Sequence, residues 1–259
     1  MFRRTLSYRQ HAFLLAAFCT LLLGATLLPS GATAKGRLLV VYDYPEPEDI
    51  QAARSIRQSE VAEEVAEIVA DWNLLDTDVT VRFGTQIGPH FTVLNNGAPE
   101  IQIPYSFYSA TRDLFAARSF VDQVSPELSA LNTLHHALYH ELGHAVIYTK
   151  QTGISEQIEE QAVDELATIM LISAYDEGAT IAASAAKAFQ LLSTEPDTVD
   201  ARNDIRRVQA ISCLIYGSDP QKNADLLEDL PTNSDSLCPA RFISYHKQWE
   251  KIFNIPLPD

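Results

Sequence analysis

Residues 125–150 read SPELSALNTLHHALYHELGHAVIYTK, and the fold prediction starts from this stretch. Ser125 followed by Pro126 is a typical helix start, because a capping side chain precedes a proline at the first helical position. Gly153 lies just beyond Lys150, at a place where helices commonly end. We therefore expect one long α-helix from about Ser125 to about Lys150.

Within this helix, residues 140–144 read HELGH and follow the pattern H-E-x-x-H. Residues four apart on a helix share a face, so His140 and His144 can present two imidazole nitrogens to one ion. Neutral imidazoles suit Zn²⁺. Glu141 lies beside them and can reach a metal-bound water without displacing a ligand. The pattern therefore predicts a zinc site with Glu141 as the catalytic general base.

A catalytic zinc site usually has three protein ligands, so the two histidines need a further partner. The longer pattern H-E-x-x-H-x-x-G-x-x-H requires glycine at position 147 and histidine at position 150, but the chain has Ile147 and Lys150. We therefore expect a carboxylate as the third ligand.

The next predicted helix, from about 155 to 175, offers that carboxylate. Glu160 and Asp164 are one turn apart, so Glu160 can bind the metal while Asp164 accepts the outer N–H of a histidine ligand. Glu159 is the main alternative to Glu160 as the ligand. A cluster of acids on a helix can also simply face solvent, which would leave the site incomplete.

The remaining patterns predict an α+β fold, with a small N-terminal mixed sheet followed by a mainly helical part. Pro99 and Pro104 bracket residues 100–103, which favours an edge strand there, paired in a hairpin with 91–94. The other expected strands are 38–42 and 79–83, and the other expected helices are 61–72, 179–192, 201–216 and 240–253.

Residues 1–34 have the layout of a secretory signal peptide. A positive start with Arg3, Arg4 and Arg9 precedes the apolar run 12–28, and the small-x-small sequence 32–34 follows. We expect cleavage after residue 34, one domain over 35–259 and a periplasmic or secreted location, with no stable membrane insertion. The alternative is an uncleaved anchor helix.

Charge and cysteine content narrow the function further. The chain has 34 acidic residues against 19 Lys and Arg, a net charge of −15, so nucleic acid is not an expected partner. Cys213 and Cys238 remain after signal cleavage, and in an oxidising compartment they predict one disulfide. Two buried free thiols are the alternative.

Three further segments carry a resemblance to a known family. Together with HELGH, the sequences EEQAVDELAT at 159–168, CLIYGSDP at 213–220 and Cys238-Pro239 resemble a bacterial family of exported proteins assigned as metallopeptidases and first described as a domain of unknown function. The resemblance spans roughly 79–246. It implies a zincin-like zinc peptidase fold but does not identify the substrate. A carboxylate as the third ligand is the arrangement found in gluzincins, and the partner we expect is a peptide or protein substrate.

The expected chemistry is hydrolysis of a peptide bond by a zinc-activated water, with residues 100–103 holding an extended peptide by main-chain pairing. Tyr216 and His246 are candidates for stabilising the transition state. His136 is expected to pack in the core or on the surface, and Tyr148 is expected to line the site or to pack. A non-catalytic, zinc-stabilised binding module is the alternative function, and an accidental H-E-x-x-H match is a third reading.

Overall fold

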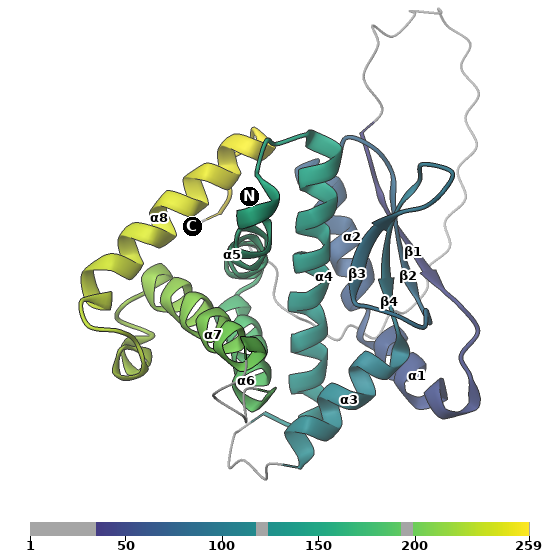
Figure 1. Cartoon of the computed structure of the whole chain (residues 1–259), viewed down its shortest axis with the longest axis horizontal. Coiled ribbons are helices and arrows are strands. Elements are labelled where there is room, and N and C mark those ends of the chain that lie inside the picture. Colours follow the sequence, from purple (N-terminus) through teal and green to yellow (C-terminus); the bar gives the residue numbers. More distant parts are fainter. Residues whose placement is uncertain (1–34, 118–123, 193–198, 259) are drawn as a thin grey trace, which may run out of the picture.

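The computed structural model describes residues 35–117, 124–192 and 199–258, so the predicted signal peptide lies outside the described residues. A four-stranded mixed sheet and a set of helices form an α+β structure (Figure 1). The strands are β1 (Leu38–Tyr42), β2 (Val79–Phe83), β3 (His90–Val93) and β4 (Pro99–Ile103). The α+β prediction is therefore confirmed.

The strand order in the sheet is β1-β2-β4-β3, with β1–β2 and β2–β4 parallel and β3–β4 antiparallel. The hairpin predicted around residues 95–97 is the β3–β4 pair. Alternate residues of β2 are fully buried, namely Val79, Val81 and Phe83, which is the period expected of a strand with one face on the core.

The prediction that residues 100–103 form an edge strand is wrong. Strand β4 lies between β2 and β3, and β3 forms the edge. Pro99 occupies the first position of β4, and Pro104 follows the strand as the residue that precedes the next helix. Neither proline therefore removes an N–H group from residues 100–103, and these can pair with neighbours on both sides.

The helices match most of the predicted patterns. Their bounds are α1 (Ile50–Ser59), α2 (Val61–Trp72), α3 (Tyr105–Ala116), α4 (Pro126–Lys150), α5 (Glu156–Ala174), α6 (Gly178–Leu192), α7 (Val199–Ser218) and α8 (Ser234–Phe253), with short 3-10 turns at Pro47–Asp49 and Ala224–Asp229. Helices α1 and α3 have no counterpart among the predicted elements. The buried residues of α1 are only Ala52, Ala53 and Ile56, which gives a weak helical pattern.

Helix α4 runs through the middle of the structure, with the sheet on one side and α5, α6 and α7 on the other (Figure 1). Its start is capped as predicted, since the Ser125 side chain accepts a hydrogen bond from the Leu128 N–H. Gly143 allows α4 and α5 to approach closely: a Cβ atom there would lie 2.8 Å from Val163 Cγ1. This close packing brings the acidic first turns of α5 next to HELGH.

Two further observations concern the hydropathy of the helices and the pairing of the cysteines. Within residues 35–117, 124–192 and 199–258, no helix combines the length and the hydropathy that a membrane crossing requires. A disulfide joins Cys213 on α7 to Cys238 on α8, which confirms the predicted pairing. The bond links two helices that also pack against each other, so it reinforces an existing contact.

Candidate metal centre

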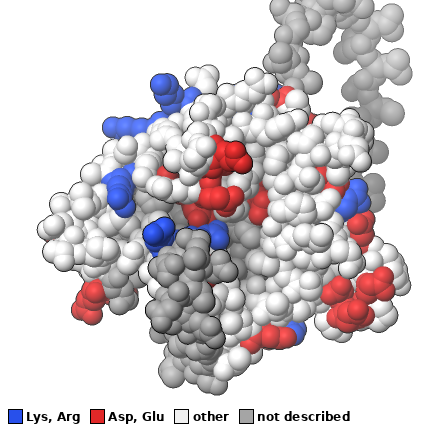
Figure 2. All heavy atoms as spheres, viewed as in Figure 1, with Lys and Arg blue, Asp and Glu red and all other residues white. Residues whose placement is uncertain are grey.

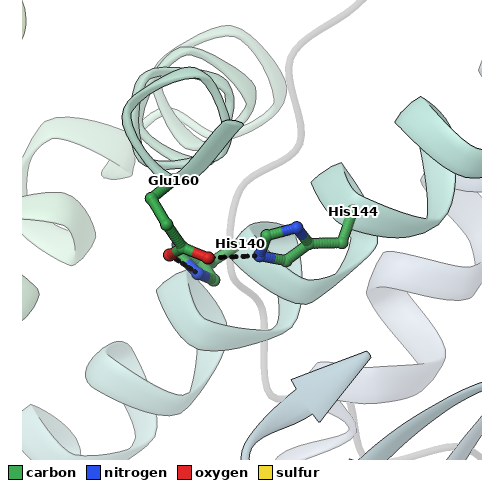
Figure 3. Close-up of side chains that lie close together, drawn as sticks. All are labelled: His140, His144 and Glu160. Atoms are coloured by element: carbon green, nitrogen blue, oxygen red, sulfur yellow. Dashed lines mark ion pairs between the residues drawn. The ribbon is translucent and has the colours of Figure 1, made fainter. Parts of the chain in front are cut away.

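His140, His144 and Glu160 converge on one point between α4 and α5 (Figure 3). One potential ligand atom from each residue lies within 4.8 Å of the others. Glu160 Oε2 lies 3.5 Å from His140 Nε2, and Glu160 Oε1 lies 3.5 Å from His144 Nε2. Two imidazole nitrogens and one carboxylate are the donor set that a catalytic zinc ion takes from a protein, so these residues fit the metal that the motif implies.

A second carboxylate holds the outer nitrogen of each histidine. His140 Nδ1 lies 2.8 Å from Asp164 Oδ1, and His144 Nδ1 lies 2.7 Å from Glu159 Oε1. When Nδ1–H donates to a carboxylate, the lone pair is on Nε2, and both Nε2 atoms face Glu160. Glu159, the alternative ligand in the sequence prediction, therefore lies on the outer side of His144 rather than at the point of convergence.

Arg207 of α7 is a site residue that the sequence analysis does not single out. Its Nε donates to Asp164 Oδ2 at 2.7 Å and its Nη2 donates to Asp164 Oδ1 at 2.6 Å. Although burial opposes it, the hydrogen bonds from His140 and Arg207 hold the pKa of Asp164 well below its usual value. Arg207 belongs to no local motif, and only the packing of α7 against α5 brings it to Asp164.

The charge states of the converging groups also suit a metal site. The hydrogen bond from His140 is the main reason that the pKa of Glu160 is lowered, which keeps this exposed carboxylate ionised. Burial lowers the pKa of His140, but the carboxylates of Asp164 and Glu160 outweigh it and raise the pKa to about 9. A metal ion would therefore have to displace a proton from this ring.

Glu141 lies next to the two histidines but outside the converging group. Its side chain is buried, and this burial raises its pKa, against the opposing effects of His140 and His144. An interaction with the Phe91 backbone of β3 also lowers this pKa. Glu141 is thus a carboxylate with increased basicity, held between α4 and the edge strand.

These residues open onto a cavity of about 790 Å³. Lining residues come from β3, α3, α4, α5, α6 and α7, and include Glu141, His140, His144, Glu159, Glu160 and Arg207. Figure 2 shows acidic side chains gathered in the middle of this face, beside a hollow in the surface. A solvent-connected cavity next to the converging donors is the arrangement that a substrate site requires.

The structure does not bring Tyr216 or His246 to this cavity. Tyr216 packs against the disulfide, and His246 Nε2 lies 3.2 Å from the Pro258 carbonyl oxygen. Both are therefore wrong as candidates for stabilising a transition state, because residue type alone does not say which side of a helix meets the site. His136 is buried, as expected of a packing residue, but it also lines the cavity. Tyr148 packs on Phe91 with 5.7 Å between ring centroids, as expected.

Comparison with known proteins agrees with this geometry. A family model described as "Putative metallopeptidase" matches residues 42–253, which include both α4 and α5. No curated protein and no solved structure was found to match the chain. Since the family match covers most of the sequence, the protein belongs to this metallopeptidase family.

Proposed function

We propose that the protein is an exported zinc metallopeptidase that hydrolyses peptide bonds, with His140, His144 and Glu160 as zinc ligands. The observation that carries the proposal is the convergence of both Nε2 atoms on the two oxygens of Glu160, with each Nδ1 occupied by a different carboxylate. Such outer carboxylates fix the histidine tautomer and increase its basicity. Asp164 and Glu159 have this positioning role.

A zinc ion held by His140, His144 and Glu160 would lower the pKa of a bound water and polarise the substrate carbonyl. Glu141 accepts the proton of the attacking water on its carboxylate and then passes it to the leaving amine. The raised pKa of Glu141 suits both steps, because a base is most effective when its pKa is near the working pH.

Edge strand β3 is the surface for an extended peptide, in place of the strand expected from the sequence. Leu94 N–H bonds Ala98 O, so by alternation the N–H and C=O groups of Phe91 and Val93 point away from β4. These main-chain groups of Phe91 and Val93 can therefore pair with a peptide. Main-chain pairing of this kind tolerates many sequences.

A catalytic rather than a structural metal site is favoured by the number of donors. Within the described residues, the converging group has three members, and structural zinc sites have four protein ligands. A zincin-like domain over residues 35–259, released by cleavage after residue 34 into the periplasm or medium, is consistent with the disulfide and with the absence of a membrane-spanning helix among the described residues.

The test uses the mature chain beginning at Lys35. We expect about one zinc per chain by elemental analysis and cleavage of a peptide library that chelation abolishes. Glu141→Gln should retain the metal and lose turnover, because the amide cannot accept the proton. Glu156→Gln, an exposed residue one turn before Glu160, is the matched control and should leave both unchanged. Turnover that survives in Glu141→Gln would contradict the mechanism.

A further inference from the structure

The cavity extends well beyond the converging donors along α4. Thr133, Ala137 and Glu141 are spaced by four residues and all line it, so they follow one face of the helix. At 1.5 Å per residue, Thr133 lies about 12 Å along the axis from Glu141. The metal centre therefore occupies only the C-terminal half of the cavity, and the other half has no part in the proposed chemistry.

The second half of the cavity is lined mainly by small and apolar side chains. Three alanines come from three different helices, and aromatic or branched side chains lie between them: Ala110, Ala137, Ala188, Phe107, Leu114 and Phe189. Alanine at each of these places leaves room that a larger residue would fill. Ala137 and Phe189 are only half-buried although they lie in the interior of their helices, since the cavity exposes them.

Phe189, on the wall of this half, is linked to the metal centre by side-chain contacts. The Arg207 guanidinium lies over the Phe189 ring at 3.9 Å, and the His136 ring meets Phe189 edge-on at 6.4 Å. Arg207 is itself bound to Asp164, which holds His140. Phe189 is therefore connected through Arg207 and Asp164 to His140, one of the proposed ligands.

We propose that this half of the cavity, named here the apolar pocket (Ala110, Ala137, Ala188, Phe107, Leu114 and Phe189), binds a large apolar side chain of the substrate next to the scissile bond. The inference rests on the proposed function and adds its substrate class. Large apolar side chains gain from leaving water, whereas charged ones would lose their hydration and find only the uncharged polar groups of Thr111, Thr133 and His136, because the Arg207 guanidinium is already bound to Asp164.

The first test measures binding without turnover. Two hydroxamic acids that bind zinc through the same group, and differ only in a benzyl or a methyl side chain, are titrated into the zinc-loaded mature protein by calorimetry. We expect the benzyl compound to bind about 10- to 100-fold more tightly, the range for burying one large apolar side chain. Equal affinities would overturn the pocket.

Filling the pocket should remove this preference. Ala137→Phe and Ala110→Phe place new rings on two different helices, so a folding defect in one variant still leaves the other to decide. We expect each to lower the benzyl-to-methyl affinity ratio at least about tenfold while the methyl compound binds within about threefold of wild type. Ala116→Phe, on the exposed end of α3 and away from the cavity, is the matched control and should change nothing.

Peptide cleavage then separates this inference from the proposed function. Mass spectrometry of a digested peptide library should show large apolar residues at one position beside the cut, and Ala137→Phe should shift that position to small residues. Cleavage with no such preference would overturn the pocket but would still support the proposed peptidase activity. A benzyl preference without any cleavage would support the pocket but contradict the proposed peptidase activity. Failure of both hydroxamic acids to bind would contradict the metal centre and, with it, this inference.

Discussion

Replacing Arg207 by methionine tests whether the arginine fixes the metal centre through Asp164. Methionine keeps much of the side-chain volume but cannot donate, so Asp164 loses hydrogen bonds of 2.7 and 2.6 Å while its carboxylate stays buried. Hydrogen bonds between charged groups contribute about 1.5–3 kcal/mol each. Because the Arg207 side chain is 31% exposed, solvent screens part of this, and we expect the free energy of unfolding to fall by about 2–3 kcal/mol in total.

The metal affinity should fall as well, since Asp164 would orient His140 less firmly. Loss of an outer partner of a metal ligand typically costs about 10- to 100-fold in affinity. Urea unfolding of the metal-free protein gives the stability, and competition with a fluorescent zinc chelator gives the affinity. Arg207→Lys should recover part of both, because lysine restores one donor but not the two-pronged contact.

Arg206→Met is the control for this experiment, because Arg206 is the neighbouring arginine of α7 and its side chain is exposed. It should leave stability and zinc affinity within error of the wild type. The reasoning is refuted if Arg207→Met is as stable as Arg206→Met and binds zinc equally well.

Three other changes have defined outcomes. The pKa of about 9 for His140 predicts that zinc affinity rises by up to about tenfold per pH unit between pH 6 and 8, which competition titrations would show; a flat profile would be inconsistent with it. Gly143→Ala should destabilise by about 1–3 kcal/mol, because its Cβ would lie 2.8 Å from Val163 Cγ1, and urea unfolding measures this. Burial lowers the pKa of His135 to about 3. Its contribution to stability is therefore complete above pH 6.5 and is lost as the pH falls toward 3. At pH 5, His135→Phe should have lost less of its free energy of unfolding than the wild type.

Most of the prediction about α4 and α5 came from local sequence patterns. The Ser125-Pro126 start and the apolar periodicity identify these helices because capping and helical period act within a few residues. Spacing of four residues then puts His140 with His144, and Glu160 with Asp164, on common faces. These relations hold for any straight helix, so no knowledge of the tertiary fold is needed to expect them.

Contacts between distant segments could not be read from the chain. Arg207 reaches Asp164 across 43 residues, and residue type alone does not distinguish it from Arg206 beside it. Likewise, only the angle between α4 and α5 places Glu159 behind His144 and leaves Glu160 in front. Which strand forms the edge of the sheet, and which residues line the apolar pocket, depend in the same way on how whole elements pack. That packing is set by the summed burial of the core and not by any single motif.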